Sequence, residues 1–362
     1  MRVLFLQPQP CIRALKYAQG FKNIPDVEVY FGYFDQTLTE FYGYGDELFE
    51  KFIKLDKKNP ERGIKDAVEK YDVEIIHSHN APDFLTASAI KAVDNLPVIH
   101  DNHDVLSLRK TKYGKNSLEP DGIEVLETEK FANEKSDGRI YVTEGLRDYV
   151  QRKYRVNPKR DLVFCNYVPE SMIPDRLKEK LSRRDGQIHI VYEGTVDSVI
   201  EGSHYDLRDI FKEIASHGMH MHIYVSHENE DYKKLAEGNN FLHYHGQLDP
   251  KTLLQELTQY DFGWAGFNTV KNKEHLDVVL SNKLIEYIVC GLPVLSFPHK
   301  TQKKFIEEHG VGFVVNDLEE LGEQLKSERV DEVHSTVLMK RFDFTVEKRI
   351  NEVVSFYRLV SS

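Results

Sequence analysis

Short apolar segments alternate with amphipathic ones along almost the whole chain, and this alternation stops only once, between residues 166 and 187. Strands that alternate with helices form a parallel sheet with helices on both faces. The sequence therefore predicts an α/β protein with two doubly wound domains. The strand-like runs lie at 1–6, 27–33, 73–77, 97–100, 138–143 and 162–165, and then at 188–192, 220–225, 241–245, 262–266, 293–296 and 312–315.

The interruption sets the expected domain boundaries. Residues 167–183 contain two prolines, several charges and no strand-like run, so we interpret them as a linker between a domain at 1–166 and a domain at 184–342. An amphipathic stretch at 343–362 predicts a C-terminal helix that packs back on the first domain. Ligands of open α/β sheets bind at the carboxyl ends of the strands, and two such domains facing each other would leave a cleft there.

Composition excludes several classes of protein. Lys and Arg total 48 against 59 Asp and Glu, a net charge of −11 that argues against a nucleic-acid-binding protein. Cys11, Cys165 and Cys290 lie too far apart for a disulfide framework or a zinc ligand set. No apolar run is long enough for a membrane helix, so we expect a cytoplasmic protein. The basic run at 147–160 would permit peripheral contact with the inner membrane surface, although a solvated face is the favoured interpretation.

Polar residues follow the expected strands. HSHNAPD at 77–83 and HDNHD at 100–104 come after two of them, and Gly194 stands at the end of a third, where a glycine lets a ligand approach the backbone. Histidines two residues apart recur at 77/79, 220/222 and 243/245, and residues at this spacing share one face of a strand. No third ligand lies at metal-ligand spacing, so we expect satisfied or solvent-facing histidines and no metal.

The segment SNKLIEYIVCGLPVLS at 281–296 is the most informative. Ser281 can cap a helix whose start would bind phosphate, and Lys283 adds a positive charge in the first turn. Lys283 and Glu286 are three residues apart and share one helix face. A cation for phosphate and a carboxylate for sugar hydroxyls would suit a nucleotide. Spacing alone still favours a capped helix with a surface ion pair.

This segment resembles the donor-binding segment of GT-B glycosyltransferases, above all the large family-four group. DVEIIHSHN, HDNHD, VFCNYVP, IVYEGTV and LHYHGQLD resemble other parts of the family and occur in the same order. The resemblance implies two Rossmann-like domains, the first for the acceptor and the second for the donor. It implies transfer of a sugar, with retention, from a UDP- or GDP-linked donor to a hydroxyl of a glycan, a lipid-linked sugar or a small molecule. It implies no cofactor and no metal.

The resemblance also assigns residues. It implies donor binding by Gly194, Thr195, Gly246, Gln247, Ser281, Asn282, Lys283 and Glu286, with Lys283 on the diphosphate and Glu286 on the ribose. It places His103, with Asp104, beside the transferred sugar. Candidates on the acceptor side are Arg13, His79 and Asn80.

The chain departs from the family pattern at one informative position. Val278 stands where the family has the first Glu of its paired-Glu motif, with Asp277 beside it. Two alternatives therefore stay open: a nucleotide-sugar epimerase or hydrolase on the same fold, and a degenerate, non-catalytic subunit that binds sugar nucleotides. Release of nucleoside diphosphate only when an acceptor is present would distinguish transfer from both.

Overall fold

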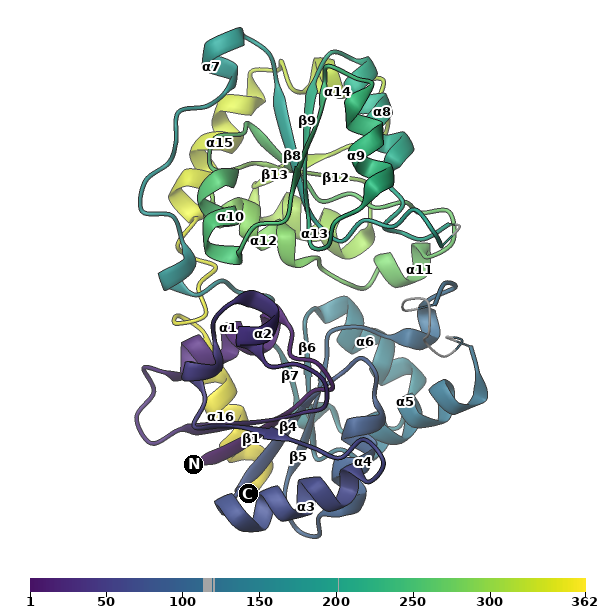
Figure 1. Ribbon diagram of the computed structural model, residues 1–362, viewed down its shortest axis with the longest axis vertical. Coiled ribbons are helices and arrows are strands. Elements are labelled where there is room, and N and C mark those ends of the chain that lie inside the picture. The colour runs from purple at the N-terminus through teal and green to yellow at the C-terminus, as the bar shows by residue number, and fades with distance from the viewer. Residues whose placement is uncertain (113–118, 120, 201) are drawn as a thin grey trace. The chain divides into compact units, whose positions relative to one another are not determined.

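The computed structural model describes residues 1–112, 119, 121–200 and 202–362. The chain forms two compact units (Figure 1). Unit 1 contains Met1–Pro169 and Thr345–Ser362, and unit 2 contains Glu170–Phe344. Each unit is built around its own parallel sheet, so the expectation of two doubly wound α/β units is confirmed.

Unit 1 has a seven-stranded sheet in the order β3-β2-β1-β4-β5-β6-β7, and every pairing in it is parallel. The order reverses between β1 and β4, as in doubly wound sheets. The strands are β1 (Arg2–Leu6), β2 (Glu28–Tyr33), β3 (Lys51–Lys54), β4 (Ile75–His79), β5 (Val98–Asn102), β6 (Gly138–Tyr141) and β7 (Asp161–Val163). The helices are α1 (Ile12–Phe21), α2 (Leu38–Tyr42), α3 (Pro60–Tyr71), α4 (Phe84–Ala92), α5 (Ile123–Lys135), α6 (Glu144–Lys153) and α16 (Ile350–Ser361), with short 3₁₀ turns at Asp46–Leu48, Leu106–Leu108 and Pro158–Arg160.

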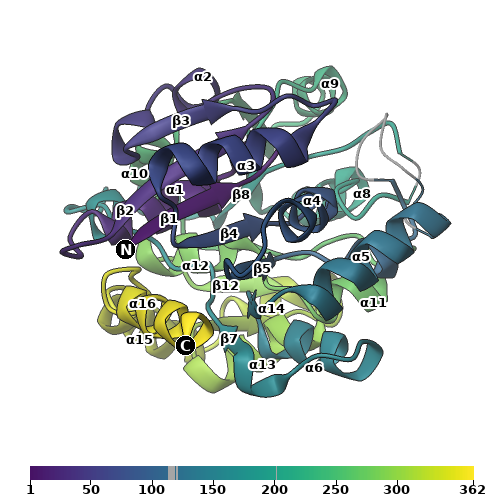
Figure 2. The same cartoon turned by 90° about the horizontal axis from the view of Figure 1, so that it is seen from below.

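Alternate residues of β1 face opposite layers of this unit. Leu4 and Leu6 belong to a core cluster with residues of α3 and α4, and α4 packs between α3 and α5 (Figure 2). The ring of Phe5 lies instead against Tyr17 of α1, with ring centroids 5.9 Å apart. The strand is thus buried on both sides, which explains its unbroken apolar sequence.

Unit 2 has a six-stranded parallel sheet in the order β10-β9-β8-β11-β12-β13. Its strands are β8 (His189–Gly194), β9 (His220–Val225), β10 (Leu242–Gly246), β11 (Phe262–Trp264), β12 (Val294–Ser296) and β13 (Gly312–Val314). A 3₁₀ turn at Glu170–Met172 precedes its helices: α7 (Ser182–Asp185), α8 (Arg208–Ser216), α9 (Glu230–Glu237), α10 (Pro250–Leu257), α11 (Lys273–Leu276), α12 (Asn282–Val289), α13 (Lys300–His309), α14 (Leu321–Gln324) and α15 (Arg329–Lys340).

The C-terminal helix is shorter than the sequence predicts. The expected helix covers 343–362, whereas α16 begins at Ile350. Thr345 instead forms a parallel bridge with Val168, and Ile350 begins the helix after a turn in which its N–H donates to the carbonyl of Val346. The N–H of Val346 also donates to the carbonyl of Val168, so the chain is held beside residue 168 before the helix begins.

Candidate functional site

The carboxyl end of β8 carries the glycine that the sequence singles out. Gly194 has φ +124°, a conformation that side chains rarely adopt. A Cβ built on Gly194 would lie 3.4 Å from Cε and 3.6 Å from Nζ of Lys283. The lysine therefore lies directly beside the bare backbone at this strand end.

Lys283 lies in the first turn of α12 and is only 7% exposed. Its Nζ is 5.0 Å from the ring centre of Tyr192 and 4.7 Å from that of Phe267, which are cation–π distances. Burial lowers the pKa of Lys283, and the carboxylates of Glu193 and Glu286 partly counteract this. An ammonium desolvated between two aromatic rings and two carboxylates is preorganised to meet an anion.

Glu286 lies one turn further along α12 and is 8% exposed. The surface ion pair that spacing alone favours for Lys283 and Glu286 is therefore wrong, because both side chains are buried. Glu193, just before Gly194, is also buried and adds a second carboxylate to this group. We call Glu193, Gly194, Lys283 and Glu286 the α12 cluster.

The start of α12 differs from the expectation in one respect. Ser281 occupies the N-cap position, but its side chain makes no capping hydrogen bond. Its hydroxyl donates instead to Oε1 of Gln302 over 2.9 Å. The next residue, Asn282, has a buried Oδ1 without a hydrogen-bond partner among the described residues. The polar groups at this helix start are thus Asn282 and Lys283 rather than the serine hydroxyl.

Three other predicted donor residues lie at the same edge of the sheet. Thr195 follows Gly194, and its hydroxyl is 3.1 Å from that of Ser226. Gly246 ends β10 with φ +73°, and a Cβ there would lie 2.8 Å from Oε1 of Glu228. Gln247, next to it, is exposed. Because β9 lies between β8 and β10, the two glycine turns flank one strand end.

The carboxylate beside Val278, that of Asp277, interacts with two lysines. Asp277 forms ion pairs with Lys273 at 2.7 Å and Lys300 at 3.9 Å, and it accepts a hydrogen bond from the Lys300 N–H. It therefore links α11 to α13. The structure gives no sign that it replaces the missing first Glu of the family motif.

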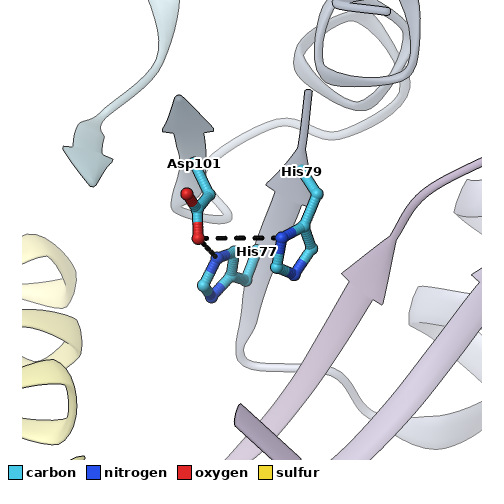
Figure 3. A group of neighbouring side chains, drawn as sticks. All are labelled: His77, His79 and Asp101. Atoms are coloured by element: carbon cyan, nitrogen blue, oxygen red, sulfur yellow. Dashed lines mark hydrogen bonds and ion pairs between the residues drawn. The ribbon is translucent and has the colours of Figure 1, made fainter. Parts of the chain in front are cut away.

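A buried polar cluster lies at the carboxyl ends of β4 and β5 in unit 1 (Figure 3). Oδ2 of Asp101 is 3.0 Å from Nε2 of His77 and 3.6 Å from Nδ1 of His79. The two imidazole rings stack with centroids 4.5 Å apart. Burial opposes the charge of Asp101, but Arg13 and the two histidines outweigh it and hold the carboxyl pKa well below its usual range.

Arg13 is part of this cluster and is only 3% exposed. Its five N–H groups all find partners in unit 1, so its expected role on the acceptor side is not supported by this arrangement. Nε donates to Asp101 at 3.1 Å. The other partners are Oδ1 of Asn166, the hydroxyl of Tyr17 and the carbonyls of Phe164 and Cys165.

Asn80 holds the loop that contains the catalytic candidates. Its Oδ1 accepts from the N–H groups of His103 at 3.0 Å and Asp104 at 3.3 Å, and its Nδ2 donates to the carbonyl of Asp104 at 2.5 Å. At 1% exposure the amide is buried, and in this structure its hydrogen bonds hold the backbone of residues 103 and 104.

His103 is the candidate best placed for chemistry in this loop. Its side chain is half-buried, and Nδ1 has no hydrogen-bond partner among the described residues. Burial lowers its pKa to about 4, so the imidazole is neutral near pH 7. The neighbouring Asp104 uses its carboxylate locally, accepting from the Val105 N–H at 2.9 Å and lying 3.6 Å from Arg109.

The competing histidines of unit 1 are fully buried. His79 is 0% exposed and packs against Phe5 and Tyr17, and burial lowers its pKa well below the usual value. His100 is also 0% exposed, with Nδ1 2.9 Å from the Thr86 hydroxyl and Nε2 3.1 Å from Asp83. Neither ring is available to a ligand in this conformation.

Two family models match the chain. Residues 49–171 match "Glycosyltransferase Family 4", and residues 202–347 match "Glucosyltransferase 3-like, C-terminal domain". Glucosyltransferase 3 of Streptococcus parasanguinis is 32% identical over 80 residues, which is 22% of this chain and 24% of that protein. The chain spans only about a quarter to a third of the length of the streptococcal relatives it matches.

Solved structures match over nearly the full length. A sucrose-phosphate synthase from Thermosynechococcus elongatus superimposes with a TM-score of 0.74 at 11% identity, covering 99% of both chains. The Anabaena protein HepE, in complex with UDP-glucose, gives a TM-score of 0.71 at 14% identity, covering 98% of this chain and 99% of its own. This chain is a GT-B-fold protein that resembles the family-four glycosyltransferases.

The two family matches of this GT-B protein cover different candidate residues. The family-four match contains His79, Asn80, His103 and Asp104, and the glucosyltransferase-3-like match contains Gly246, Lys283 and Glu286. Gly194 and Arg13 lie outside both. Among the described residues, no helix combines the length and the apolar character needed to cross a bilayer.

Sequence reasoning missed Glu193 as a member of the α12 cluster. A signal was present, because Glu193 directly precedes the glycine that ends β8. The alternation of β8 does not distinguish a functional carboxylate from one that faces solvent. Only the packing of α12 against the end of β8 makes it a neighbour of Lys283.

Proposed function

We propose that this protein is a glycosyltransferase that moves a sugar from a nucleotide-sugar donor to a hydroxyl acceptor, with the donor bound by the α12 cluster of unit 2. The observation that carries this proposal is the position of Lys283, desolvated and 3.6 Å from where a Gly194 Cβ would be. The missing side chain leaves room for a diphosphate beside the ammonium.

Each part of a nucleotide sugar then has a partner of matching chemistry. Lys283 and the start of α12 neutralise the diphosphate, and Glu286 accepts from the ribose hydroxyls. Gly246 and Gln247 flank the base. Since HepE binds UDP-glucose, a UDP-linked hexose is the first donor to test.

The proposed reaction needs little covalent participation by the protein. The bond between the sugar C1 and the diphosphate oxygen breaks, the acceptor oxygen bonds to C1 on the same face, and the acceptor proton passes to the departing phosphate. In this scheme Lys283 stabilises the charge that develops on the leaving group. In unit 1, His103, neutral near pH 7, is the side chain that we propose for the transfer step.

The test is the substitution Lys283→Met measured by calorimetry with UDP and with uridine. A hydrogen bond to a charged group is worth about 1.5–3 kcal/mol. The Kd for UDP should therefore rise about tenfold or more, while the affinity for uridine changes much less. Lys300→Met is the matched control, because Lys300 is 80% exposed.

The products distinguish transfer from the alternatives. Transfer requires that UDP appear only when an acceptor is present. UDP release without an acceptor would favour a hydrolase, and interconversion of two UDP-sugars would favour an epimerase. Tight UDP binding without turnover across an acceptor panel would favour a non-catalytic binding subunit. If Lys283→Met binds UDP as tightly as the parent, the proposed donor site loses its main support, whichever of these activities the protein has.

A further inference from the structure

Five histidines lie on one face of the sheet of unit 2, on β8, β9 and β10. His189 begins β8 and His220 begins β9, and they are partners in the parallel register. His222, His243 and His245 lie on the same face of β9 and β10, with ring centroids 4.4 Å apart for 222/243 and 5.2 Å for 222/245. Spacing along the sequence pairs these histidines only within one strand, whereas the strand order β10-β9-β8 brings them together across three strands.

Asp185 at the end of α7 completes a possible ligand set. Its Oδ2 is 3.0 Å from Nε2 of His189 and 4.0 Å from Nε2 of His220, and the three ligand atoms all lie within 4.8 Å of one another. Zinc binds imidazole nitrogen and carboxylate oxygen at about 2.0–2.2 Å in a tetrahedron, which places its ligand atoms roughly 3.3–3.6 Å apart. The observed separations of 3.0 Å and 4.0 Å from Oδ2 of Asp185 lie just below and just above that range.

The site is accessible from solvent. The side chain of Asp185 is 39% exposed and that of His220 is 14% exposed, so an ion can enter and keep a water as a further ligand. The distance of 4.0 Å between His220 and Asp185 is too long for a hydrogen bond, whereas an ion between them would bind both.

The other ring nitrogens of both ligand histidines already have acceptors. A histidine that binds a metal through Nε2 carries its proton on Nδ1 and donates it to a neighbouring group. Nδ1 of His189 is 2.9 Å from Nε2 of His222, and Nδ1 of His220 is 2.8 Å from Nε2 of His243. His222 repeats the arrangement, with Nδ1 2.9 Å from Nε2 of His245. If His189, His220 and His222 each carry the proton on Nδ1, all three contacts are hydrogen bonds and Nε2 of His189 and of His220 can bind a metal.

The cluster of His77, His79 and Asp101 in unit 1 has similar spacing but does not suit a cation. The guanidinium of Arg13 already binds Asp101 at 3.1 Å and would repel a metal ion. All three potential ligands are 0% exposed, which leaves an ion no entry path. The cluster in unit 1 thus already holds a cation, the guanidinium of Arg13, whereas the carboxylate of Asp185 in unit 2 is partly exposed.

We propose that Asp185, His189 and His220 bind one divalent transition-metal ion, with zinc the best match, and that the ion fastens the α7 segment to the start of β8 and β9. This site is separate from the proposed donor site. His189 begins β8 and Gly194 ends it, so the two lie roughly 16 Å apart at about 3.3 Å per residue. The ion would stabilise unit 2 rather than take part in sugar transfer.

The experiment uses the full chain without an affinity tag, stripped with EDTA and then titrated with Co²⁺ and Zn²⁺. We expect one saturable equivalent, tetrahedral Co²⁺ absorption and a higher Tm with Zn²⁺. Asp185→Asn and His220→Gln should each abolish the Co²⁺ spectrum. His243→Gln, which removes only an outer partner, should weaken binding about tenfold. Both Asp185 and His220 are partly exposed, so these variants are expected to fold.

Two controls make the result specific. His227→Gln changes an exposed histidine beyond the opposite end of β9 and should leave Co²⁺ binding unchanged. UDP affinity should be the same with and without EDTA, because the donor site lies elsewhere. The proposal is overturned if no saturable binding occurs, if both ligand variants bind Co²⁺ like the parent, or if His79→Gln rather than His220→Gln abolishes it.

Discussion

At the scale of single residues, the buried carboxylate on α12 makes a specific prediction. Glu286→Gln keeps the shape of the side chain and removes its charge. If Glu286 accepts from the ribose hydroxyls, the Kd for UDP should rise about tenfold, which corresponds to about 1.4 kcal/mol. The parent should also prefer UDP over 2′-deoxy-UDP, and Glu286→Gln should lose most of that preference. Calorimetry with both nucleotides measures this, and an unchanged preference would place Glu286 away from the ribose.

His103 makes a prediction about turnover. We expect His103→Ala to lower kcat at least tenfold while the Kd for UDP stays within a factor of two or three, because the imidazole belongs to unit 1 and the proposed nucleotide site to unit 2. Its pKa of about 4 keeps the ring neutral, so its own protonation should not alter kcat between pH 6 and 8. Steady-state kinetics decide the matter. His217→Gln is the control, because this exposed histidine directly follows α8, just before β9 begins, at the opposite edge of the sheet from the donor candidates. An unchanged kcat in His103→Ala would show that His103 has no part in turnover.

At the scale of elements, the contact between β6 and α16 predicts a stability change. A Cβ on Gly138 would lie 2.7 Å from Cγ2 of Val360 and 2.9 Å from Cζ of Phe356. Gly138→Ala should therefore lower the free energy of unfolding by about 1–3 kcal/mol through overpacking. Urea unfolding measures it. In Gly322→Ala the new methyl meets nothing within 4 Å, so this control should lose no stability.

The elements that the sequence did not predict share a physical character. The strand β3 is an edge strand with a lysine at each end, and only one side of it pairs with another strand. The helices α9 and α13 are mostly polar, and each buries two residues or fewer. Such elements can form with a weak apolar pattern because contacts with neighbouring segments stabilise them. The periodicity of their own sequence therefore does not predict them.

At the scale of the whole molecule, the buried neutral histidines predict a pH dependence of stability. Burial lowers the pKa of His103 and of His299 to about 4, against 6.5 in the unfolded chain. Between these values the unfolded state binds more protons, so stability rises with pH and falls as pH drops from about 6.5 toward 4. For His299, which is 2% exposed, the loss at pH 5 amounts to at most about 2 kcal/mol.

Urea unfolding at pH 7.5 and pH 5 measures this dependence. His299→Gln should flatten the decrease, whereas His227→Gln, which changes an exposed ring, should not. Equal slopes in His299→Gln and the parent would show that His299 is protonated in the folded state near its ordinary pKa.

The sequence by itself determined the two doubly wound units, the polar strand-end loops, and the pairing of Lys283 with Glu286 on one helix face. These follow from periodicity and spacing over a few residues, which are local properties of the chain. Only the tertiary structure decided that this pair is buried, that Arg13 is committed to interior hydrogen bonds, and that histidines 31 and 33 positions apart in sequence form one network. Those outcomes depend on the order of the strands in each sheet and on which helix covers which strand end. Parallel strands are joined by long crossover connections, so the local sequence of a strand does not show which other strand pairs with it.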